Sequence, residues 1–328
     1  MYKNLIFMIS VVLFSSIFVE YTYGNDLLTT NEDYDKEYHP VYIDNFDSYG
    51  QKIQLIFYEK PRRVIAVGEN AAKTILALGL SDSLVAIVET VENGKLLKEL
   101  YPLDFESENF LVLSKIDKET ILMLEPDLII AWQSRFNDKM LGTTYFWHQR
   151  NVMTYIPPST VETDKPKTLS QEYQYILDIG KIFNIEAETN NLVSEMNLRI
   201  DQAANNVKYR SSPTVLILAF SRDLIISYGA NSLPGDIVKK AGGVLLTTPR
   251  YISYEELLQL NPDVMFIVRL DSKFKETENS ILQKKVLRNL NCVKNKRIYA
   301  LSIHWLYNSS VSSIDGIQAV IKGLYGEL

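Results

Sequence analysis

EAETNNLVSEMNLRIDQAANNVK, residues 186–208, is the stretch on which the organisation of this chain depends. It contains no Gly and no Pro, so nothing in it favours a kink. Its apolar residues recur at helical spacing and form one stripe. They are Leu192, Met196, Ile200, Ala203 and Val207, with Val193 and Ala204 beside them. A helix over this range is about 35 Å long, which is enough to cross a domain. An ordinary surface helix has the same stripe, but similar strand and helix patterns on both sides favour a connector between two lobes.

The two sides of this helix share an internal repeat. Residues 119–130, ETILMLEPDLII, match residues 255–266, EELLQLNPDVMF. Both copies have the frame E-x-x-L-x-L-x-P-D followed by three apolar residues. A helix, a Pro-Asp stop and a buried strand form one αβ unit, and such units in series build a parallel sheet covered by helices. The repeat therefore predicts two lobes of similar architecture.

The predicted fold class is α/β, with two Rossmann-like lobes whose parallel sheets are joined by a single long linker helix. The ligand cleft is expected between the lobes, at the carboxyl ends of the strands. The predicted segments are an export signal at 1–24, a leader and hairpin at 25–60, a first lobe at 61–185, the linker helix at 186–208 and a second lobe at 209–328. The predicted strands are 64–67, 84–88, 127–132, 151–156, 214–220, 224–227, 264–268 and 297–300, after a hairpin over 41–58. The predicted helices are 70–80, 118–124, 169–183, 235–241, 254–260 and 313–325.

The first 24 residues have the composition of an export signal. Lys3 supplies a basic start, residues 5–19 form an apolar run, and Gly24 ends a candidate cleavage site. The run is short for a membrane crossing. No Cys follows it that could carry a lipid. We therefore expect a periplasmic, or at least extracytoplasmic, protein with a cleaved signal peptide and no lipid anchor; an uncleaved anchor is the alternative.

Composition narrows the function classes. The chain has 328 residues, of which 46% are hydrophobic, so a large core can form. A net charge of −6 argues against a nucleic-acid-binding surface. Cys292 is the single cysteine, which excludes an intramolecular disulfide and a cysteine-based metal site. The dinucleotide, P-loop, zinc-protease and serine-hydrolase motifs are absent, so the chain is not predicted to be an enzyme.

Taken in order, several stretches resemble the substrate-binding proteins of iron-siderophore, haem and vitamin B12 ABC importers, the helical-backbone class. The resemblance covers residues 40–328. It rests on PRRVIA at 61–66, LALGL at 76–80, LEPDLII at 124–130, LDIGKIF at 177–183, AGG at 241–243, LNPDV at 260–264 and RIYA at 297–300. It implies a monomer without an intrinsic cofactor that captures an iron chelate, first of all a ferric siderophore, and delivers it to an inner-membrane ABC permease. Haem and cobalamin are the alternative ligands.

The resemblance also implies where the permease would dock. Members often carry an acidic residue early in one helix of each lobe, and Asp236 matches this position in the second lobe. In the first lobe the matching residue is Lys73, which reverses the charge, so Glu69 is the candidate substitute.

Residues just after the predicted strands are the candidates for the cleft. They are Glu69, Asn70, Trp132, Arg135, Tyr228, Arg250, Tyr251, Arg269, His304, Trp305 and Tyr307. Arg135, Arg250 and Arg269 could converge on an anionic ligand, because guanidinium donors suit carboxylate and catecholate oxygens; solvated loop arginines are the alternative. Trp132 and Trp305 could stack on a flat ligand such as a corrin ring, or pack in the core.

Iron ligation and other functions remain open alternatives. His304 could ligate haem iron, or be a hydrogen-bonding surface residue. Tyr228, Tyr251 and Tyr307 could supply phenolate to ferric iron. A bare metal site is not predicted, because His and acidic residues do not cluster at ligand spacing. An enzyme or metallocluster-handling protein on this fold, and a structural or signalling module that lost transport, are the other two classes.

Overall fold

The computed structural model describes residues 38–107, 109–163, 165–207, 212–221, 224–269, 271–303, 305 and 310–326. The predicted export signal and the start of the leader lie outside the described residues. Among the described helices, none combines the length and the hydropathy that a membrane crossing requires.

The first lobe contains a five-stranded parallel sheet in the order β5-β4-β3-β6-β7. Its strands are β3 (Val64–Val67), β4 (Leu84–Val88), β5 (Leu111–Leu113), β6 (Leu128–Ala131) and β7 (Met153–Tyr155). Its helices are α1 (Glu69–Ala77), α2 (Val91–Leu100), α3 (Pro102–Glu106), α4 (Lys118–Met123) and α5 (Thr144–His148), with short 3-10 turns η1 (Ser81–Ser83), η2 (Gln133–Arg135) and η3 (Pro158–Thr160). All four residues of β3 are buried, because helices cover both faces of the sheet. The strand order reverses between β3 and β6, which is where open α/β sheets bind ligands.

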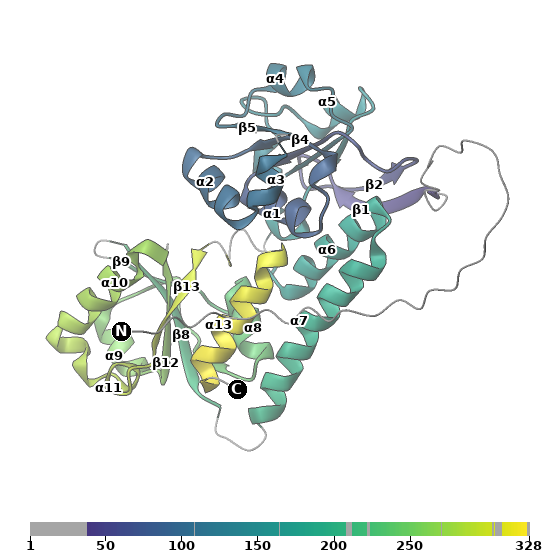
Figure 1. Cartoon of the computed structure of the whole chain (residues 1–328). Coiled ribbons are helices and arrows are strands. Elements are labelled where there is room, and N and C mark those ends of the chain that lie inside the picture. The colour runs from purple at the N-terminus through teal and green to yellow at the C-terminus, as the bar shows by residue number, and fades with distance from the viewer. Residues whose placement is uncertain are drawn as a thin grey trace, which may run out of the picture. The chain divides into compact units, whose positions relative to one another are not determined.

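A separate two-stranded sheet precedes this lobe. β1 (Val41–Phe46) and β2 (Lys52–Phe57) pair antiparallel, as the predicted hairpin requires. The turn between them is closed by Asp47, whose Oδ1 accepts the backbone N–H groups of Tyr49 and Gln51, both at 2.8 Å. Ile43, Leu55 and Phe57 bury the inner face of the hairpin in the core of the first lobe. Figure 1 shows the hairpin beside α6 (Leu169–Phe183).

The predicted linker helix is α7 (Glu186–Val207). Met196, Ile200 and Ala203 of its apolar stripe are buried in the core of the second lobe. In Figure 1, α13 (Ser313–Tyr325) runs beside it. The stripe is therefore the face that packs, as its period predicts.

The preceding helix, α6, contributes to both lobes. Its Leu169 and Ile176 belong to the core of the second lobe, whereas Ile182 and Phe183 belong to the core of the first. A Thr168–Gln171 capping box begins it. α6 thus also spans the two lobes, and it packs against the predicted linker helix α7.

The second lobe contains a mixed sheet in the order β11-β9-β8-β12-β13, with β10 beside β8. Its strands are β8 (Thr214–Ser221), β9 (Leu224–Ser227), β10 (Val244–Leu245), β11 (Tyr251–Ile252), β12 (Val264–Arg269) and β13 (Ile298–Ser302). Its helices are α8 (Leu233–Lys240), α9 (Tyr254–Leu260), α10 (Asp271–Gln283), α11 (Asn291–Lys294) and α13, with 3-10 turns η4 (Lys285–Asn289) and η5 (Ser310–Ser312). The α/β fold with two sheet-bearing lobes is confirmed, but β9 and β11 run antiparallel to their neighbours. The connection from β8 to β9 is too short for a parallel crossover, so it forms a hairpin.

The repeat occupies equivalent places in the two lobes. In the first lobe, Asp127 precedes β6 and accepts the N–H groups of Arg62 and Arg63 at 2.7 and 3.0 Å, just before β3 begins. In the second, Asp263 precedes β12 and accepts the N–H of Thr214, the first residue of β8, at 2.9 Å. Each Pro-Asp step therefore fastens its own strand to the start of the adjacent central strand.

Candidate functional site

A cavity of about 980 Å³ is lined by residues of both lobes. The first lobe contributes Trp132, Ser134 and residues 159–163, which follow β6 and β7. The second contributes residues 226–234 and three positions near β11, namely Thr247, Thr248 and Arg250. Lys167 and Glu172, at the start of α6, lie between these two walls. The cavity thus lies at the carboxyl ends of strands, where the fold class places the cleft.

Three of the predicted residues line this cavity. They are Trp132, Tyr228 and Arg250. The indole Nε1 of Trp132 is buried and has no hydrogen-bond partner among the described residues. A buried donor of this kind is costly without an acceptor, and because Nε1 itself is covered, Trp132 lines the cavity with other atoms of its side chain.

The predicted cluster of arginines does not form. Arg135 lies with its guanidinium 3.8 Å from the Met140 sulfur, and it does not line the cavity. Arg269 donates from Nε to the Thr277 Oγ1 of α10 at 2.8 Å, which holds it on another face of the second lobe. Arg250 is therefore the one arginine of the three that reaches the cavity.

The predicted pair of tryptophans does not form either. Trp305 packs against the core of the second lobe, where it limits the space beside Gly316 of α13. Tyr251, on the edge strand β11, is 55% exposed and outside the cavity lining, with the Arg250 guanidinium 5.9 Å from its ring centre. Among the described residues, Trp132 is thus the aromatic side chain with which the first lobe lines the cavity.

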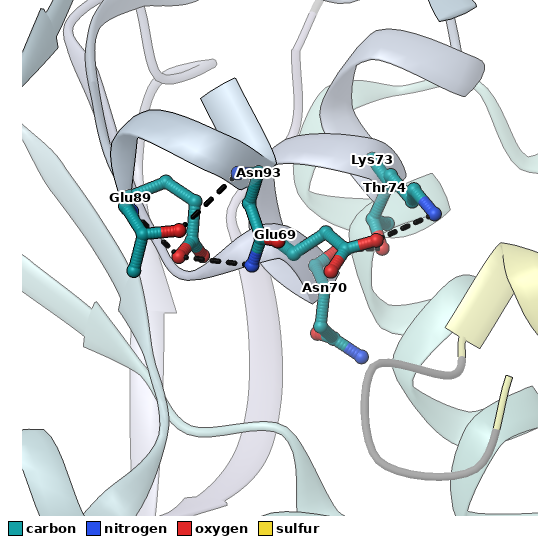
Figure 2. A network of polar contacts seen from close by, with 7 residues as sticks. Glu69, Asn70, Lys73, Thr74, Glu89 and Asn93 are labelled. Carbon is teal, nitrogen blue, oxygen red and sulfur yellow. Dashed lines mark hydrogen bonds and ion pairs between the residues drawn. The ribbon is translucent and has the colours of Figure 1, made fainter. Parts of the chain in front are cut away.

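Glu69 and Asn70 line neither the cavity nor the surface. Glu69 has a fully buried side chain, and its Oε1 lies 2.6 Å from the Lys73 Nζ, which is itself almost buried. Figure 2 shows this pair facing one another, with the Asn70 amide directed away from it. The figure also shows Glu89, which follows β4, accepting a hydrogen bond from the Asn93 amide. Glu69 is thus buried beside Lys73, and α1 packs against η5, so a docking role for Glu69 stays a prediction.

Asp236, the docking candidate of the second lobe, is partly exposed. Its Oδ2 accepts the N–H of Leu169 at 2.9 Å and the Lys240 ammonium at 2.7 Å. It therefore joins α8 to the first turn of α6, and a docking role for it stays a prediction.

Sequence reasoning missed the charged residues at the start of α6. Lys167 donates from Nζ to the backbone carbonyl of Val161, and burial lowers the pKa of this amine. Glu172 is buried and accepts the N–H of Ser310 at 2.6 Å. The helical period predicted α6, but the face that meets the cavity depends on how α6 packs between the lobes.

The described residues add no evidence for iron ligation by the predicted His and Tyr side chains. His304 and Tyr307 lie outside the described residues. Among the described residues, no group of three His, Cys, Asp or Glu side chains could hold a metal ion.

Comparison with known proteins agrees with this architecture. Residues 64–303 match the family model described as Periplasmic binding protein. The vitamin B12-binding protein of Vibrio cholerae is 24% identical over 79% of this chain and 87% of its own length. The high-affinity heme uptake system protein IsdE of Staphylococcus aureus is 29% identical over 56% of this chain and 62% of its own.

Solved structures resemble this fold as well. A periplasmic binding protein from Veillonella parvula is 30% identical, with a TM-score of 0.81, over 87% of this chain and 92% of that one. The family match spans more than half of the chain and both lobes. The chain belongs to the periplasmic binding protein family.

Proposed function

We propose that this protein captures a large metal chelate of low net charge in the cavity and delivers it to an ABC permease, with a corrinoid as the first candidate. The observation that carries the proposal is the charge balance of the cavity. Among the described residues that line it, Lys167 and Arg250 are balanced by Glu162 and Glu172. A volume of about 980 Å³ suits a large ligand, since small-molecule pockets span roughly 300–1,000 Å³.

The polar groups of the lining also suit a neutral ligand. Most of them are hydroxyls, including Ser134, Thr160, Ser227 and Thr248. Hydroxyls can hydrogen-bond to the peripheral amides of a corrinoid without a net charge on either side. A highly anionic ferric catecholate would need more cations than the described part of this lining supplies.

The relatives support a chelate of this kind. The Vibrio cholerae relative is named for vitamin B12 and the Staphylococcus aureus relative for heme, and both ligands are metal macrocycles. A ferric siderophore, which the sequence favoured, is the second candidate, in a form of low charge such as a hydroxamate. Location outside the cytoplasm, action as a monomer and binding without bond chemistry belong to the same proposal.

The first test is a fluorescence titration with cyanocobalamin, haemin, a ferric hydroxamate and a ferric catecholate. We expect micromolar or tighter binding of the corrinoid and the weakest binding of the catecholate. Trp132→Phe should weaken binding about tenfold through loss of stacking area, as expected for roughly 1–1.5 kcal/mol. Trp305→Phe, which changes a partly buried tryptophan outside the described cavity lining, is the matched control. Tightest binding of the catecholate would contradict the charge argument.

A further inference from the structure

We propose that the turn of the β1–β2 hairpin, acting through Gln133, positions one wall of the cavity and so sets ligand selectivity. The wall is residues 157–163, between β7 and α6, and residues 159–163 of it line the cavity. The ligand part of this inference rests on the proposed function. Positioning of the wall does not, because it can be measured without a ligand.

The hairpin first holds the base of the wall. Asn45, near the end of β1, is 1% exposed. Its Nδ2 donates to the carbonyl of Ile156 at 3.1 Å, and its Oδ1 accepts the N–H of Ile156 at 2.9 Å. The side chain thus completes both backbone hydrogen bonds of the residue that precedes the wall, as a neighbouring strand would do.

The turn of the hairpin then contacts Gln133. The Gln133 Nε2 donates to the carbonyl of Ser48 at 3.3 Å, and the N–H of Ser48 donates to the Thr144 Oγ1 at 3.1 Å. Gly50 has a φ of +77°, and a Cβ there would lie 3.1 Å from the Gln133 Nε2 and 3.5 Å from the Val161 Cγ1. The left-handed backbone and the close approach both favour glycine, so the turn fits directly against Gln133 and the wall.

Gln133 passes this contact on to the wall. Its Oε1 accepts the N–H of Glu162 at 2.7 Å, and its own N–H donates to the Thr160 Oγ1 at 3.4 Å. Its chain neighbours Trp132 and Ser134 both line the cavity. The Gln133 side chain therefore links the turn to the wall, and Gln133 adjoins two residues that line the cavity.

The wall depends on such partners because it has little structure of its own. It contains a single 3-10 turn, η3, and no strand. Its far end is held by Lys167, which donates to the Val161 carbonyl and, through its N–H, to the Asn231 carbonyl of the second lobe at 3.0 Å. The β1–β2 pair is not hydrogen-bonded into the sheet of the first lobe, so it acts on the wall through side chains and the turn.

Gln133 is the residue to change, since Asn45 is deeply buried and its loss could unfold the lobe. We compare Gln133→Ala and Gln133→Glu with Gln54→Ala, an exposed residue of β2 whose Nε2 lies 3.3 Å from the Asp44 Oδ1. The Gln133→Glu variant keeps an acceptor for the Glu162 N–H but loses the donor to Ser48. Amide hydrogen exchange of peptides spanning 157–163, without ligand, and affinities for the four chelates are measured together with thermal stability.

For Gln133→Ala we expect faster exchange in 157–163, a loss of affinity of roughly five- to tenfold, and a changed ratio of affinities among the chelates. Gln133→Glu should be intermediate, and Gln54→Ala should match the wild type. The proposal would be overturned if Gln133→Ala and Gln54→Ala had equal amide exchange rates in 157–163 and equal ratios of affinities for the chelates. If the wild type binds none of the chelates, the proposed function fails, and the exchange result alone still decides whether Gln133 positions the wall.

Discussion

Two helices, α1 in the first lobe and α8 in the second, each carry an acidic residue paired with a lysine four residues later, but the two pairs differ in burial. On α1, Lys73 lies 2.6 Å from Glu69, four residues earlier, and the two side chains are 8% and 0% exposed. On α8, Lys240 lies 2.7 Å from Asp236 at the same spacing, with exposures of 39% and 18%. Spacing and distance are nearly equal, so burial decides the energetic role of each pair. A buried partner left alone is expensive, whereas an exposed pair contributes little.

The largest effect is expected where the buried pair is broken. Lys73→Met leaves the Glu69 carboxylate without its cation inside the protein, and this should lower the free energy of unfolding by about 3–5 kcal/mol. Urea unfolding at neutral pH measures it. The double variant Glu69→Gln/Lys73→Met removes both charges and should recover most of the loss. A single variant as stable as the wild type would show that α1 does not bury this pair.

A buried carboxyl held by uncharged hydrogen-bond donors extends the comparison. Asp178 of α6 accepts hydrogen bonds from the Tyr155 hydroxyl at 2.8 Å and the Gln174 amide at 2.6 Å. Burial raises the pKa of Asp178 to about 6, against an ordinary value of 3.8, although the two hydrogen bonds oppose the rise.

The folded-state pKa of this acid lies above the unfolded one, so ionisation disfavours the folded state. The free energy of unfolding should therefore decrease as pH rises from about 4 to about 6 and level off above that. Asp178→Asn should remove this decrease, so that the variant gains about 2 kcal/mol relative to the wild type between pH 4 and pH 7. Urea unfolding across this range tests it, and a constant difference between the two proteins would contradict it.

A smaller effect is expected at the exposed pair. Asp236→Asn weakens both the bond to Lys240 and the acceptor for the N–H of Leu169 at the start of α6, and about 1 kcal/mol of stability should be lost. Lys240→Ala breaks the ion pair alone and should cost less than about 0.5 kcal/mol. Thermal or urea unfolding of both variants measures the difference. Equal losses would mean that the bond to α6 contributes nothing.

Local sequence signals explain why the bounds of several helices and strands were predicted as the structure has them. The strands Val64–Val67, Leu84–Val88 and Leu224–Ser227 and the helices Leu169–Phe183, Tyr254–Leu260 and Ser313–Tyr325 begin and end as predicted. Each strand is marked by its own apolar run, and each helix by its own apolar period and the residues that stop it. The capping boxes that begin Leu169–Phe183 and Tyr254–Leu260 show that the start of both helices is encoded locally.

Elements with weak local signals were missed. α2 contains Gly94, which weakens its helical signal. This glycine lies close to the three-residue strand β5, since a Cβ added to it would be 3.3 Å from the Val112 Cγ1. β5 itself lies at the edge of the sheet with two of its residues exposed, so its apolar pattern is short. Neither element carries a strong period, and both depend on the sheet beside them.

By itself, the sequence determined the α/β class, the repeated Pro-Asp unit, the packing stripe of the linker helix and Trp132, Tyr228 and Arg250 as residues at the cavity. These follow from period, capping and position after a strand. Only the tertiary structure decided that Arg269 bonds to Thr277, that Glu69 is buried against Lys73, and that Lys167, Glu172 and the wall beside Gln133 meet at the cavity. Period tells which residues share a face of one element, but contact between elements far apart in sequence is set by how those faces pack.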